Sequence, residues 1–183
     1  MLSNARKRTR SRLWMFALAL ACAGTGPSTR AVAQPVDIPG PPGTQYFGAT
    51  VALLPNGNFV VTDPFAQSNQ VGAVYLYRPD GTLISSLTGS TAMDQVGSGG
   101  ITTLASGNFV VASPAWSNGS ATAAGAVTWV NGNTGLNGTV SAANSLVGSA
   151  TDDNVGLPFI YDPVFALPNG NYVVTSSKWN NAA

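Results

Sequence analysis

Residues 54–62 read LPNGNFVVT, and this stretch decides the fold because the chain uses it three times. The second copy, at residues 104–112, reads LASGNFVVA, and the third, at residues 167–175, reads LPNGNYVVT. Each copy places a Gly, which tolerates the positive φ of a tight turn, between apolar and β-branched residues, as in two short strands joined by a turn. The sequence therefore predicts three copies of one β-hairpin, centred on Gly57, Gly107 and Gly170.

The hairpin belongs to a longer repeat. GAVY at residues 72–75 follows the first copy as GAVT at residues 125–128 follows the second, and SLTGS and SLVGS close the two units. We predict four antiparallel strands per unit, joined in chain order. In the first unit they should span residues 50–54, 59–62, 73–77 and 83–87. Longer loops rich in Asn, Gly, Ser and Thr explain why the spacing of the central glycines grows from 50 to 63 residues.

Tandem four-stranded units of this length are typical of the blades of a β-propeller, which pack radially. We therefore predict an all-β, propeller-like fold with an incomplete set of about 2.5 blades, and a β-solenoid is the alternative. The predicted segments are a signal peptide (1–33), a Pro- and Gly-rich linker (34–45), repeat unit 1 (46–90), repeat unit 2 (95–149) and a partial repeat unit 3 (155–183).

Trp116 and Trp179 are separated by the same 63 residues as Gly107 and Gly170. The sequence thus stops in the middle of a unit, before the expected Gly-Ala-Val strand. We expect the N-terminal part of a longer repeat protein or a truncated reading frame, and a complete product is the alternative. An incomplete unit would leave an open sheet edge, which favours pairing with another chain.

The N-terminus has the pattern of a secretory signal peptide. Five of the eight Lys and Arg residues lie within residues 6–12, an apolar run follows at residues 13–23, and residues 31–33 read AVA, a small-residue cleavage site. The run is shorter than the ~20 residues that span a bilayer. We predict export, to the cell surface, the medium or the periplasm, with a retained anchor as the alternative. Cys22 fits the apolar run, and lipidation at this residue is the other interpretation.

Composition excludes several classes of function. Cleavage after Ala33 would leave a chain without His, Cys or Glu, with Arg78 and Lys178 set against seven Asp residues. Disulfides, thiol chemistry and a basic surface for nucleic acid are therefore excluded from this part. A nucleophilic Ser or Thr would lack a His as its general base.

Three motifs of the first unit resemble the FG-GAP repeat of integrin α-chain propellers: Phe47-Gly48, Asp63-Pro64 and GAVYLY at residues 72–77. The calcium-binding blades of that family carry an Asp-rich loop before the second strand. Here the loop reads PNGN or ASGN, without a carboxylate. Because Ca²⁺ sites usually include carboxylate oxygens, we predict neither a metal nor a cofactor.

The second unit is more similar to a bacterial tandem repeat of unassigned function, found in exported, filamentous-haemagglutinin-like surface proteins. The similar motifs are GNFVV at residues 107–111, Trp116, and GAVTW at residues 125–129. The resemblance covers residues 46–183. It implies a fold and leaves the activity open.

Few residues are candidates for catalysis, and we predict no catalytic residue. Asp152 and Asp153 lie in a turn-rich link between units, while Asp63 and Asp162 each precede a Pro. We expect these carboxylates to cap turns. Ser176-Ser177-Lys178 resembles a Ser-Lys pair, but the repeat itself accounts for its position.

Trp116, Trp129 and Trp179 are the possible ligand contacts, because a Trp beside amide-rich loops suits sugars or peptides; packing between units is the alternative. The predicted function is a structural, adhesive or protein-interaction role at the cell surface. The alternatives are a carbohydrate-binding module and a fragment of a propeller hydrolase whose catalytic residues lie outside this chain. Expected partners are an extracellular protein or glycan, further repeats, or another copy; neither nucleic acid nor a membrane span of the mature chain is expected.

Overall fold

The computed structural model describes residues 12–15, 36–158 and 162–180, and within these ranges the chain forms only strands, turns and loops. The prediction of an all-β fold is confirmed. The strands form separate sheets, none of which closes on itself, so a propeller-like arrangement stays a prediction. In this described part there is no helix of the length and apolarity needed to cross a membrane.

The N-terminal part contributes one small sheet, in which β1 (Arg12–Met15) pairs antiparallel with β2 (Val36–Pro39). The remainder of the predicted signal peptide, residues 1–11 and 16–33, lies outside the described residues. β2 falls in the segment that the sequence marks as a linker, and the side chain of Ile38 is buried against the first repeat sheet. Part of this segment therefore packs on the folded body.

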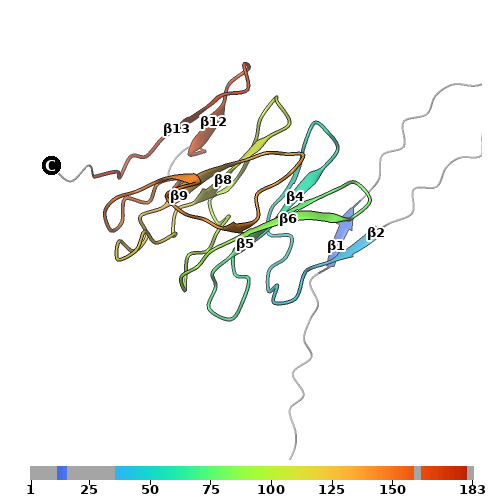
Figure 1. Cartoon of the computed structure of the whole chain (residues 1–183), viewed down its shortest axis with the longest axis horizontal. Helices are drawn as coiled ribbons and strands as arrows, with labels where there is room; N and C mark the ends of the chain where they lie inside the picture. Colours follow the sequence, from blue (N-terminus) through green and yellow to red (C-terminus); the bar gives the residue numbers. More distant parts are fainter. Residues whose placement is uncertain (1–11, 16–35, 159–161, 181–183) are drawn as a thin grey trace, which may run out of the picture.

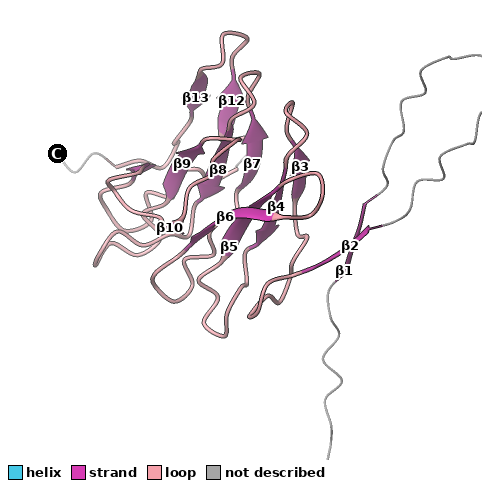
Figure 2. Cartoon of the chain, turned by 45° about the vertical axis from the view of Figure 1, so that its right-hand side comes forward, coloured by secondary structure: helices cyan, strands magenta, loops and turns pink. Residues whose placement is uncertain are grey.

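The first repeat unit forms the four-stranded antiparallel meander predicted for it (Figures 1 and 2). Its strands pair in chain order, and each end lies within one residue of the prediction. They are β3 (Val51–Leu53), β4 (Phe59–Asp63), β5 (Ala73–Tyr77) and β6 (Leu83–Thr88).

The second unit repeats this order with β7 (Gly100–Thr103), β8 (Phe109–Ser113), β9 (Ala126–Val130) and β11 (Ser145–Val147). The third contributes one hairpin, formed by β12 (Val164–Ala166) and β13 (Tyr172–Val174). The short strand β10 (Gly138–Thr139) leaves the second unit and pairs in parallel with β6 of the first. Sequence reasoning assigned this stretch to a loop, because two residues carry no periodicity.

The hydrophobic core lies between the sheets, which pack face to face. All residues of β4 and β8 are buried, as expected of strands covered on both faces. Val60 and Leu76 of the first sheet meet Phe109 of the second. On the far face of the second sheet, Val110 packs with Val164 of the third-unit hairpin. Alternate residues of a single strand thus bind the preceding and the following unit.

Two further kinds of contact join consecutive units. β7, the first strand of its unit, contacts β3 on one side and β12 on the other. The start of each third strand forms a parallel bridge with the entry to the next unit, at Gly72–Val96 and Gly125–Val155. These bridges require glycine, because a Cβ on Gly125 would lie 2.2 Å from the backbone nitrogen of Val155. The start of each third strand therefore positions the entry to the next unit.

A comparison of two glycines tests this close approach. Gly107 and Gly125 have nearly equal φ values, 82° and 79°, but a Cβ on Gly107 would meet nothing within 4 Å. Gly107→Ala should therefore lower the free energy of unfolding by only about 1 kcal/mol, the cost of the left-handed backbone. Gly125→Ala should cost roughly 3 kcal/mol or more, because the units must separate. Urea denaturation measures both, and equal losses would contradict the bridge.

Candidate functional site

The junction between the first and second units is built around the buried carboxylate of Asp94. Its Oδ2 atom accepts backbone hydrogen bonds from Ser90 at 2.9 Å and Thr91 at 2.8 Å, in the loop that ends the first unit. Its Oδ1 atom accepts a third, at 3.0 Å, from the backbone of Ser117, which follows Trp116 in the second unit. One side chain thus holds two consecutive units together.

Asp153 repeats this arrangement at the next junction. Its Oδ2 atom accepts the backbone N–H groups of Ser149 and Ala150, both at 2.8 Å, and its Oδ1 atom accepts that of Asn180 at 2.8 Å. Asn180 follows Trp179 as Ser117 follows Trp116. We call the two arrangements the Asp94 clasp and the Asp153 clasp. The prediction that Asp153 caps a turn is confirmed, and its bond to Asn180 adds a link to the third unit.

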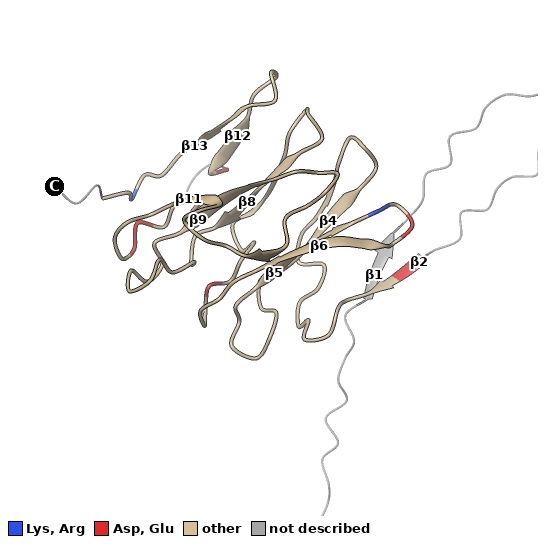
Figure 3. Ribbon diagram, viewed as in Figure 1, with Lys and Arg blue, Asp and Glu red and all other residues tan. Residues whose placement is uncertain are grey.

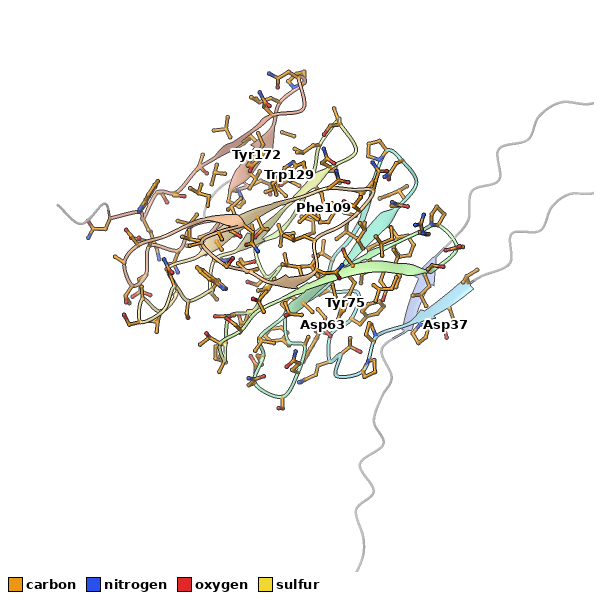
Figure 4. The ribbon with its side chains drawn as sticks, in the orientation of Figure 1. Asp37, Asp63, Tyr75, Phe109, Trp129 and Tyr172 are labelled. Atoms are coloured by element: carbon orange, nitrogen blue, oxygen red, sulfur yellow. The ribbon has the colours of Figure 1, made fainter. Side chains whose placement is uncertain are left out.

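Asp63 performs a related task at the N-terminal side of the first unit. Its carboxylate is fully buried at the end of β4, near Tyr75 (Figure 4). It accepts backbone hydrogen bonds from Gln45 at 2.7 Å, Tyr46 at 3.0 Å and Phe65 at 3.2 Å. The bond from Phe65 is the turn cap that the sequence predicts before Pro64. Asp63 therefore fastens the segment that leads into the first unit.

The hydrogen bonds to Asp153 favour a structural role for its carboxylate. Hydrogen bonds from the backbone of Ala150, Asn180 and Ser149 lower the pKa of Asp153. A carboxylate held in its ionised form accepts hydrogen bonds well, whereas a carboxyl group that donates a proton near neutral pH needs a raised pKa. Burial raises the pKa of Tyr75 to about 12, with a smaller contribution from the negative charge of Asp63.

Charged residues occur sparsely along the described chain (Figure 3). Asp152 and Asp162 are exposed, and the backbone of Asp152 adopts a positive φ of 64°. Lys178 donates a hydrogen bond from its Nζ atom to Oδ1 of Asn154 at 3.2 Å. In this arrangement the amine binds an amide oxygen in the link between the second and third units. The Lys178 amine of the Ser-Lys pattern thus contacts the link that precedes its own unit.

The three candidate tryptophans lie in different environments. Trp116 is buried in the core between the first two sheets and only 4% exposed. Trp129, on β9, and Trp179, after β13, are 42% and 47% exposed. Trp116 and Trp179 make the same turn, in which their backbone N–H groups bind Ser113 and Ser176. The structure therefore does not gather them into one platform, and of the three only Trp129 and Trp179 are exposed enough to stay candidates for ligand contact.

The hairpin loops use their amide side chains for local and inter-unit bonding. Oδ1 of Asn56 accepts the backbone N–H of Asn58 at 3.1 Å, and both side chains donate to the carbonyl oxygen of Gly132 in the second unit. Among the residues described, no group of three or more His, Cys, Asp or Glu side chains is placed to hold a metal ion. The loop of the first hairpin thus binds the backbone of the neighbouring unit.

Sequence reasoning did not single out Asp94. A signal was present, because DQVG at residues 94–97 recurs as DNVG at residues 153–156. The two copies also share backbone conformation, with positive φ values at Gln95 and Asn154. The shared Asp, two residues before a Val-Gly pair, is what identifies the clasp in the sequence.

The stacked sheets and the two clasps together define an all-β protein built from tandem repeats. A family model described as a repeat of unknown function (DUF5650) matches residues 103–157 and 166–183. These ranges include most of the second unit and, in the third-unit hairpin, the last residue of β12 and all of β13. No curated protein and no solved structure shows a significant match to the chain. The match supports the repeat, while the FG-GAP and filamentous-haemagglutinin-like resemblances stay predictions.

Acid should weaken the Asp153 clasp. Because the pKa of Asp153 is lowered on folding, its stabilising contribution is complete above its unfolded value of about 4 and disappears as the pH falls through the folded value. Asp153→Asn should therefore be less stable than the wild type near neutral pH, and the difference should narrow below about pH 4. Urea denaturation across this range measures it, with exposed Asp152→Asn as the matched control. A difference independent of pH would contradict the clasp.

The buried indole of Trp116 can be tested separately. Its Nε1 atom has no hydrogen-bond partner among the described residues. Trp116→Phe removes this donor and keeps a ring, so the loss of stability should stay below about 1.5 kcal/mol. Trp116→Ala leaves a cavity and should cost about 3–5 kcal/mol. Trp129→Ala, on the surface, is the control and should cost less than about 1 kcal/mol. A small effect of Trp116→Ala would contradict a packing role.

Proposed function

We propose that the chain is an exported, propeller-like repeat protein with a structural or adhesive role at the cell surface or outside the cell. The observation that carries this proposal is the use of buried carboxylates. Asp63, Asp94 and Asp153 each accept three backbone hydrogen bonds, and each joins separate segments of the repeat array. Side chains that an enzyme would use for proton transfer are thus used here for assembly.

The contacts between first strands support a radial arrangement of the units. β7 contacts both β3 and β12, and the first strands of propeller blades converge in this way near the central axis. On the outer side, β10 crosses from the second unit to β6 of the first. In a radial arrangement the sheets lie farther apart on the outer side, and β10 would fill the space between the first and second sheets there.

The surface supports a role in binding or display. Figure 3 shows that most of the described chain carries neither positive nor negative residues. The loop at residues 117–124 is instead built of Ser, Asn, Gly, Thr and Ala. Uncharged hydroxyl and amide groups offer hydrogen bonds to a protein or glycan partner without the cost of removing ions from water. The sheets would hold such loops in fixed positions.

Carbohydrate binding is the second candidate function, and the exposure of Trp179 favours it. This indole is 47% exposed and is followed by an exposed Asn, a pairing of apolar face and amide that suits a sugar ring. A glycan array read with Trp179→Ala separates this function from a purely structural role. Glycan binding that is unchanged by Trp179→Ala would show that Trp179 is not part of the binding site.

Export is tested directly by expressing the tagged chain in a bacterial host. We expect an N-terminus at Gln34 in the exported fraction, and the tag should be digested when intact cells are treated with protease. Leu18→Arg together with Leu20→Arg interrupts the apolar run and should keep the protein in the cytoplasm. The matched control, Leu18→Ile with Leu20→Ile, should be exported normally. Cytoplasmic retention of the wild-type chain would overturn the proposed location.

A further inference from the structure

The second sheet carries an apolar patch, which we call the β9 patch, formed by Trp129 on β9 and Leu146 on β11. These side chains are 42% and 43% exposed. The repeat alignment places Trp129 at the position of Leu76 in the first unit and Leu146 at that of Leu87. Leu76 and Leu87 are 1% and 2% exposed. The same two repeat positions are thus buried in one unit and open to solvent in the next.

The burial of Leu76 and Leu87 comes from the following unit. Both belong to the core cluster that contains Val130, from the third strand of the second unit, and Val140, from the segment after it. The third unit contributes its first hairpin to the described chain. That hairpin covers Val110 and Val127 of the second sheet through Val164 and its neighbours. The β9 patch therefore lies where a third strand of the third unit would cover it.

One edge of β13, in the third-unit hairpin, also lacks a strand partner within the described chain. β4 pairs with β3 and β5, and β8 pairs with β7 and β9. β13, the corresponding strand of the third unit, pairs with β12 on one side in the described chain. Its other edge presents backbone N–H and C=O groups of the kind that accept an added strand.

The chain beyond β13 is already held in the position that the second unit uses. The Asp153 clasp binds the backbone of Asn180 as the Asp94 clasp binds that of Ser117. The turn before each residue is also the same. The third unit therefore follows the hydrogen-bonding pattern of the second unit as far as Asn180, the residue that corresponds to Ser117. A third strand would follow from this point.

We infer that the edge of β13 left unpaired within the described chain and the β9 patch together bind a strand that has the sequence pattern of the third strand of this repeat. The recognised segment has the pattern GAVTWV of residues 125–130. In the register of β8 and β9, where Val111 is opposite Thr128, the residue corresponding to Thr128 lies opposite Val174. Residues corresponding to Ala126 and Val130 then face the β9 patch, since both face the preceding sheet in the second unit.

This inference deepens the proposed assembly role and rests on it, because it names the partner as a strand of the same repeat. An intact second copy is not that partner. Its third strands, β5 and β9, are paired on both sides. Two copies could instead pair through their β13 edges. Such a dimer would not involve a strand with the GAVTWV pattern.

The test is an extended chain in which residues 118–149 are repeated directly after Asn180. The appended copy carries Trp129→Phe, which keeps its peptides distinguishable by mass. Hydroxyl-radical footprinting should show oxidation of Trp129 falling at least about fivefold, towards the level of buried Trp116. Amide hydrogen exchange at Tyr172 and Val174, whose N–H groups point away from β12, should slow at least about tenfold relative to the unextended chain.

The matched control is the same extension with Ala126→Asp and Val130→Asp in the appended copy only. It places charges against the β9 patch, and Trp129 oxidation should return to the value of the unextended chain. Equal oxidation and exchange in the two extensions would overturn the inference. So would a dimer of the unextended chain, seen by sedimentation, in which the amides of β13 are already protected.

A second arm uses the unextended chain, so the result does not depend on folding of the extension. A synthetic peptide of residues 122–131 is added at about millimolar concentration. We expect slower exchange at Tyr172 and Val174, and no effect from the same peptide carrying Val130→Asp. Absence of protection in both arms overturns the inference. Because all measurements use purified protein, a failure of export would contradict the proposed location and leave this result standing.

Discussion

Burial of both faces of each central strand is the constraint on which the structure depends. β4 and β8 lie between layers, so their alternate residues must each find an apolar partner in a different neighbouring segment. A single four-stranded sheet of this kind would expose both of its apolar faces to water. Each unit is thus stable only in the company of its neighbours, as in other repeat proteins with short units.

This dependence explains the distribution of polar groups. A chain with few charges and no His has little to offer for surface ion pairs, and its buried carboxylates are satisfied by backbone N–H groups. Each Asp oxygen accepts bonds from segments that would otherwise have to desolvate their amides without a partner. Apolar packing brings the sheets together, and the carboxylates select one relative position of consecutive units.

Local patterns predicted the strands because the signals that define them are local. The Asn-Gly turn at Gly57 and the alternation around it specify the β3–β4 hairpin, and the same pattern identifies its copies at Gly107 and Gly170. The environments of Trp116 and Trp129 were not predictable in this way, because burial depends on which unit covers each ring. β10 was missed because its partner, β6, belongs to another unit, and the partners of Asp94 lie in two loops on either side of it in the sequence.

The two clasps form hydrogen bonds only with the main chain of the loops that they hold. Ser90, Thr91, Ala150 and Asn180 have different side chains, yet each supplies the same backbone group to a carboxylate. Substitutions at these loop positions can therefore accumulate without loosening the joint, provided that the main-chain N–H remains and proline is avoided. An array built in this way can diversify its outer surface while its internal spacing stays constant.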